Sequence, residues 1–155
     1  MHIAVAYFKP GIKHINVDID GKSRTIAYQF PYTVFIQVSQ LGTTSGYAYF
    51  TKSKPTEKSI LYEMEFPNAR SNGGLCVGDV HLMDPEVTRP KQVVERMEHV
   101  LFGAVYNDDY KDYYLPFKHH FQNYPEEVMS RDPASWKLSG GKKVTLGEKL
   151  MNFQK

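Results

Sequence analysis

The first half of the chain alternates short apolar and polar stretches, which is the pattern of half-buried β-strands. In one stretch Val34, Ile36 and Val38 alternate with Phe35, Gln37 and Ser39. Turn signals such as Asp20-Gly21 and Leu41-Gly42 separate the stretches. The pattern predicts strands at residues 3–8, 14–19, 25–30, 33–40, 46–51 and 59–66. Short connections between successive strands predict an antiparallel meander.

The second half changes to helical spacing. Residues 90–102 form one apolar face, made by Val93, Val94, Met97, Val100 and Leu101. Pro90 suits the first turn of this helix and Gly103 suits its end. Residues 107–114 are predicted as a tyrosine-rich loop or broken helix, and residues 124–130 as a helical turn or two.

The end of the chain predicts a short amphipathic helix. Thr145 and Glu148 have the spacing of a capping box, and Leu146, Leu150 and Phe153 follow on one face. Gly140-Gly141-Lys142-Lys143 before it is interpreted as a flexible hinge. The prediction is therefore an α+β fold, with one domain over residues 1–138 and a hinge and helix over residues 139–155.

Composition narrows the class of protein. A chain of 155 residues fits one domain, and 41% hydrophobic residues exclude wholesale disorder. A net charge of +2 argues against a nucleic-acid partner. No apolar run reaches the roughly 18 residues of a membrane span, and the start lacks the features of a signal peptide. We expect a soluble, cytoplasmic protein without a membrane partner.

The single cysteine, Cys76, excludes an internal disulfide framework and any zinc site that needs two thiolates from this chain. It is either a small buried hydrophobe or a reactive thiol. It follows Asn72-Gly73-Gly74, which favours a tight turn with positive φ values. A cysteine in irregular structure near glycines is better placed for reactivity than one within a strand.

Other candidate chemistry is weak. The neighbouring His119 and His120 diverge on a strand or a helix, and no ligand spacing joins them to Cys76, His81 or His99. Neither glycine pair has the spacing of a phosphate-binding loop. We therefore predict neither a metal site nor a cofactor.

The segment before Cys76 resembles the active-site segment of ubiquitin-conjugating (E2) enzymes. That segment has a Pro-Asn pair, a Gly five residues after the Asn, and an apolar residue followed by Cys eight residues after the Asn. Pro67-Asn68, Gly73 and Leu75-Cys76 match these positions in register. Cys76-Val77-Gly78 is similar to the prokaryotic E2-like family that includes protein B of the PRTRC gene cluster. The resemblance covers about two-thirds of the chain.

The resemblance implies an E2-like meander followed by helices, and a carrier that accepts a ubiquitin-like protein as a thioester on Cys76. Its partners would be an E1-like (ThiF-type) adenylating protein and the ubiquitin-like protein. Asn68 would stabilise the oxyanion, and Asp79 or His81 would take the proton of the attacking amine. As residues, Asn68 also suits a turn, and Asp79 a loop or helix cap.

Phe66 stands where the E2 family usually has a His before Pro-Asn, so the structural hydrogen bond of that His is lost. One alternative is therefore a catalytically inactive binding or scaffold module on the same fold. Another is a phage or plasmid structural component with an accidental likeness to E2. The proline-rich turn of eukaryotic E2 enzymes is absent from this sequence.

Overall fold

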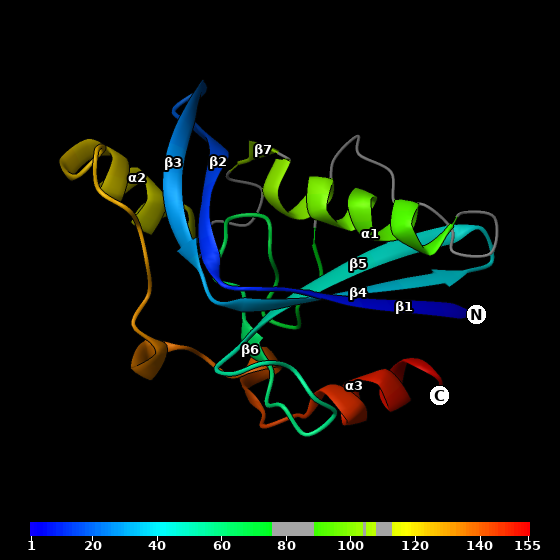
Figure 1. The fold of residues 1–155 in the computed structure, drawn as a ribbon. Coiled ribbons are helices and arrows are strands. Elements are labelled where there is room, and N and C mark those ends of the chain that lie inside the picture. Colours follow the sequence, from blue (N-terminus) through cyan, green and yellow to red (C-terminus); the bar gives the residue numbers. More distant parts are fainter. Residues whose placement is uncertain (76–88, 104, 108–112) are drawn as a thin grey trace.

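A computed structural model describes residues 1–75, 89–103, 105–107 and 113–155 of the chain. Cys76, Asp79 and His81 lie outside these residues. The described part is α+β, with an antiparallel, sheet-rich N-terminal half followed by helices (Figure 1). No helix in this part of the chain is long and apolar enough to cross a membrane.

One long, bent hairpin builds the N-terminal half. Its strands are β1 (His2–Phe8), β2 (Gly11–Ile19), β3 (Lys22–Phe30) and β4 (Tyr32–Gln40). β2 pairs with β3, β1 pairs with β4, and the register of the first pair continues into the second. The predicted turn at Asp20-Gly21 is confirmed, with both residues at positive φ. The hairpin bends where Pro10 lies opposite Pro31, since neither residue has an N–H for the ladder.

This bend divides the predicted meander between two sheets. The first sheet has the order β1-β4-β5-β6, with β5 (Thr43–Thr51) and β6 (Tyr62–Glu63) following in antiparallel pairing. The second has the order β3-β2-β7, in which β7 (Val105–Tyr106) runs parallel to β2. The antiparallel pairing is thus as expected, but β1 pairs with β4 rather than with its neighbour in sequence.

The strand predicted over residues 59–66 is wrong in length, because β6 has two residues. The backbone here pairs with an irregular C-terminal segment instead of with a regular strand. The Leu61 N–H donates to the Val144 carbonyl at 3.0 Å, and the Glu63 N–H donates to the Lys137 carbonyl at 2.9 Å. Sequence pattern does not reveal a partner so distant along the chain.

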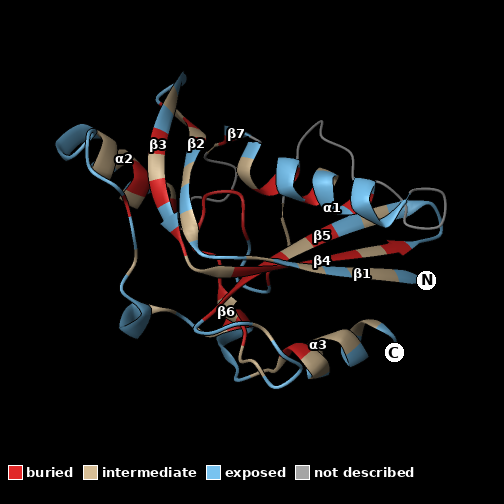
Figure 2. Cartoon of the chain, in the orientation of Figure 1, coloured by how far each residue is buried: buried red, intermediate tan, exposed pale blue. Residues whose placement is uncertain are grey.

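Two helices lie on opposite faces of the first sheet (Figure 1). The predicted helix over residues 90–102 is confirmed as α1 (Pro90–Glu98), which continues into a π-helical turn, η1 (His99–Gly103). The predicted C-terminal helix is confirmed as α3 (Leu146–Phe153), with both hydrogen bonds of the capping box. Because both faces are covered, β4 is buried on both sides rather than half-buried (Figure 2).

The structure corrects the region between these helices. Residues 108–112 of the predicted loop or broken helix lie outside the described residues, and the helix α2 (Tyr114–Asn123) begins at the last residue of that prediction. Residues 124–130, which were predicted to be helical, are not helical. The Met129 N–H donates to the Ala27 carbonyl and the Gln29 N–H donates to the Met129 carbonyl, each at 2.8 Å. Pairing with the edge of β3 therefore replaces the expected helical turns.

Candidate functional site

The turn before Cys76 closes on itself. The Arg70 N–H donates to the Gly74 carbonyl and the Gly73 N–H donates to the Arg70 carbonyl, each at 2.9 Å. Gly73 has a φ of 94°, so the predicted positive φ in this turn is confirmed there. The Asn72 carboxamide oxygen accepts a further hydrogen bond from the Gly74 N–H at 3.0 Å. Three hydrogen bonds therefore hold a turn that ends at Leu75.

The end of this turn pairs with β5 through a short antiparallel bridge. The Leu75 N–H donates to the Gly46 carbonyl, and the Ala48 N–H donates to the Gly73 carbonyl, each at 2.9 Å. The backbone is thus fixed to the sheet up to the residue that directly precedes Cys76. The predicted roles of Cys76, Asp79 and His81 concern residues outside the described chain and stay predictions.

Tyr49 explains why position 73 of this turn is a glycine. Its hydroxyl donates to the Asn72 carbonyl at 2.7 Å, and a Cβ added to Gly73 would overlap the Tyr49 ring. Burial raises the pKa of Tyr49, so its hydroxyl stays protonated and remains a donor. Sequence reasoning attributed Gly73 to turn geometry alone, because nothing in the sequence places Tyr49 beneath it.

The C-terminal segment holds the outer side of the turn. The Gly140 N–H donates to the Ser71 carbonyl at 2.7 Å, and Ser139 is buried. Residues Ser139–Gly141 form a short 3-10 turn in which both glycines have positive φ. The glycines interpreted as a hinge therefore also shape a contact with the turn, which sequence reasoning did not anticipate.

Asn68 is anchored at the start of the segment. It is 6% exposed, and its Oδ1 accepts a hydrogen bond from the Asn107 N–H at 2.8 Å. This bond fixes the orientation of the carboxamide, so Oδ1 faces Asn107 and Nδ2 is its donor side. Asn68 alone among the four predicted site residues is placed by the structure.

Phe66, in the position where the E2 family usually has His, lies at the centre of an aromatic cluster. Its ring centroid is 4.7 Å from that of Tyr28, and 5.0 Å from those of Tyr106 and Phe117. It is fully buried. The Phe66 ring therefore stabilises this region by packing, whereas a His at this position would do so by hydrogen bonding.

Two buried carboxylates precede Phe66. Glu65 Oε2 lies 2.6 Å from Nη2 of Arg131, and Glu63 accepts a hydrogen bond from the Tyr113 hydroxyl. The Glu65 contact is an ion pair without hydrogen-bond alignment, since neither of its oxygens has a hydrogen-bond partner among the described residues. Burial raises the pKa of Glu65 although Arg131 opposes the shift. Sequence analysis missed this cluster, because its members lie far apart in the chain.

The predicted absence of a metal site stays a prediction for the chain as a whole. Within the described residues, no three His, Cys, Asp or Glu side chains form a group that could hold an ion. His119 Nδ1 lies 3.1 Å from the Asn123 amide nitrogen, and His120 Nε2 lies 2.8 Å from the Glu127 carbonyl oxygen. These two imidazoles therefore make local contacts at the end of α2.

Comparison with protein families matches residues 1–131 to prokaryotic E2 family D. The match spans most of the chain, including the whole turn and Asn68, and the chain therefore belongs to this family. Searches of curated proteins and of solved structures found no significant match.

Proposed function

We propose that the protein is an E2-like carrier that accepts a ubiquitin-like protein as a thioester on Cys76 and transfers it to an acceptor. The observation that carries this proposal is the register of Asn68, Gly73 and Cys76 within a family-D E2 domain. The fixed turn supports it, because a nucleophile needs a defined approach to its substrate.

The chemistry has two steps. In the first, the Cys76 thiolate attacks the carbonyl carbon of a modifier thioester held by an E1-like (ThiF-type) adenylating protein. The oxyanion collapses and expels the thiolate of that partner. In the second, an acceptor amine attacks the new thioester, gives its proton to a base and expels the Cys76 thiolate.

The chain's own residues divide these tasks. The donor side of the Asn68 carboxamide would stabilise the oxyanion in the second step, while its Oδ1 stays bound to Asn107. Asp79 and His81 remain the proposed acceptors of the amine proton.

The test is reconstitution with an E1-like protein and a ubiquitin-like protein from neighbouring genes, together with ATP. We expect a mass adduct on the chain that DTT removes, and a DTT-resistant ester or no adduct with Cys76→Ser. Failure to form the adduct, or a DTT-sensitive adduct that survives Cys76→Ser, would contradict the proposal.

The inactive-module alternative gives a different result in the same preparation. Because the chain has one cysteine, thiol labelling of the native protein reports Cys76 alone. Labelling as slow as that of a buried thiol, together with no adduct, would favour a binding or scaffold module of a phage or plasmid system.

A further inference from the structure

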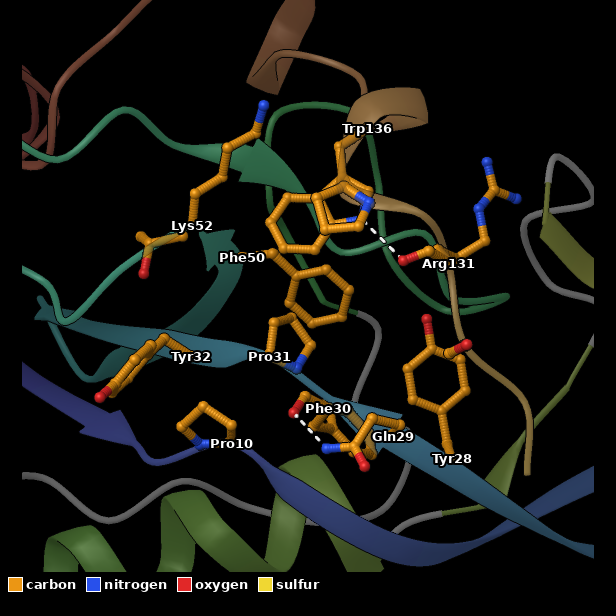
Figure 3. A pocket seen from close by; sticks show the side chains of 13 residues that line it. Pro10, Tyr28, Gln29, Phe30, Pro31, Tyr32, Phe50, Lys52, Arg131 and Trp136 are labelled. Atoms are coloured by element: carbon orange, nitrogen blue, oxygen red, sulfur yellow. Dashed lines mark hydrogen bonds between the residues drawn. The ribbon is translucent and has the colours of Figure 1, made fainter.

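A cavity of about 330 Å³ lies at the bend of the long hairpin (Figure 3). Its volume is in the range of sites that bind small molecules or a few residues of a peptide. Its walls come from the bend, the end of β5 and residues 130–136. On β5 it begins at Phe50, four residues from the Gly46 that pairs with Leu75, a distance of roughly 13 Å along a strand. The cavity is therefore separate from the turn before Cys76.

Most of the residues that line the cavity carry aromatic or proline rings. Trp136 lies over Phe50, with a centroid distance of 5.6 Å, while Pro31, Tyr32 and Pro10 lie below them (Figure 3). The Trp136 indole N–H donates to the Arg131 carbonyl at 3.4 Å, which helps to hold the ring in place. Rings of this kind bind apolar, rigid groups with little loss of side-chain entropy.

The backbone at the bend restricts what can bind there. Pro10 and Pro31 have no N–H to offer, and Tyr32 is already paired with Thr51 of β5. A partner strand therefore cannot extend a hydrogen-bonded ladder across this cavity. A polyproline II segment needs no such ladder, and its rings dock into grooves lined by aromatic residues.

The charged residues that line the cavity determine which side chains can lie beside the prolines of such a segment. Two of the lining residues are cationic and none is acidic. Arg131 is already paired with Glu65, and its guanidinium points away from the cavity (Figure 3). Lys52 is exposed at the rim, where its Nζ lies 4.9 Å from the centroid of the Tyr62 ring. An acidic side chain beside the prolines can therefore pair with Lys52.

We propose that this cavity is a docking site for an extended, proline-containing peptide segment that carries an acidic residue. Its occupant is recognised by ring packing against Tyr32 and Trp136 and by charge at Lys52. The site acts independently of Cys76, so it and the thioester chemistry can fail separately.

Trp136 is the only tryptophan in the chain, so its fluorescence reports the cavity directly. The full chain and its Cys76→Ser variant are titrated with a capped peptide of six prolines between two glutamates. Capped peptides with Gly-Ser in place of proline, or lysine in place of glutamate, serve as matched ligands. We expect a saturable change in emission with the first peptide, equal in both proteins. We expect weaker binding with lysine flanks and none with Gly-Ser.

Two variants locate the site. Tyr32→Ala is expected to weaken binding about tenfold, as for an aromatic anchor. Lys52→Glu changes an exposed side chain and is expected to weaken binding about fivefold. Tyr124→Ala is the matched control, since Tyr124 is exposed beyond α2 and does not line the cavity. The absence of a saturable signal, equal binding of the Gly-Ser peptide, or unaltered affinity in Lys52→Glu would overturn the proposal.

Discussion

At the scale of single residues, Asn68 combines a structural bond with a proposed chemical role. Its Oδ1 accepts the Asn107 N–H, while oxyanion stabilisation would use the hydrogens on Nδ2. Substitution can separate the structural role of Oδ1 from the proposed chemical role of Nδ2. Aspartate retains an acceptor for Asn107 but removes the amide donor, whereas alanine removes both.

We predict that Asn68→Asp and Asn68→Ala both slow transfer from the Cys76 thioester to an amine by about 100-fold, as for the loss of an oxyanion donor. The rate at which the thioester forms is expected to change less than the rate of this transfer. Asn68→Asp should unfold at a urea concentration nearer to that of the unmodified chain than Asn68→Ala does, because aspartate keeps an acceptor for the Asn107 N–H. Single-turnover discharge to free lysine measures the rate. Asn123→Ala, in α2, is the control. Discharge by Asn68→Asp at the unmodified rate would show that Asn68 acts through its bond to Asn107 alone.

At the scale of elements, α3 depends on its cap and on its apolar face. Thr145 accepts a hydrogen bond from the Glu148 N–H at 3.1 Å, and Glu148 accepts one from the Thr145 N–H at 2.8 Å. Leu146 packs in the cluster with Val34 and Ile36, on the sheet face opposite α1. A helix of eight residues has little stability of its own, so cap and packing decide whether it forms.

Thr145→Ala is therefore expected to lower the free energy of unfolding by about 1 kcal/mol, because the Glu148 N–H loses its acceptor. Thr145→Ser keeps a hydroxyl at the same position and should stay close to the unmodified chain. Urea unfolding, extrapolated linearly to water, compares the two. Equal stability of the alanine and serine variants would contradict a contribution from the cap.

Elements with local signals could be predicted from the sequence, and those that depend on distant partners could not. The turn at Asp20-Gly21, the helix at Pro90 and the capping box at Thr145 each carry their signal within a few residues. The shortening of β6 and the pairing of Met129 with β3 arise from contacts across the molecule. The bend could also have been predicted from the sequence. If the register set by the Asp20-Gly21 turn is continued along both strands, Pro10 comes to lie opposite Pro31.

The candidate site shows the same division. The spacing of Asn68, Gly73 and Cys76 was visible in the sequence, and so was the turn chemistry around Gly73. The turn is contacted by Tyr49 and Ser139, and Asn68 is contacted by Asn107, across separations of 23 to 68 residues along the chain. No local pattern encodes these pairings, because they follow from how the sheets and the C-terminal segment pack.

At the scale of the whole molecule, Glu65 lies where the segment before Asn68 meets the C-terminal part of the chain. It is 3% exposed and pairs with Arg131. Burial raises its pKa in the folded protein above the ordinary value of 4.5. Between that value and the raised pKa, the folded state binds more protons than the unfolded state. Ionisation of Glu65 therefore makes the protein less stable as the pH rises through this window.

We predict that the unmodified chain gains stability relative to Glu65→Gln as the pH falls from 7.5 towards 4.5, because only the carboxyl group can take up the proton. Urea unfolding of both proteins at several pH values gives the difference in free energy directly. Glu95→Gln is the control, since Glu95 is exposed on α1 and solvent screens its charge. A difference between the unmodified chain and Glu65→Gln that is constant with pH, or that grows in the opposite direction, would show that burial does not govern this carboxyl group. Growth in the opposite direction would mean that the ion pair with Arg131 dominates and stabilises this junction, whereas a constant difference would mean that the ion pair offsets the effect of burial.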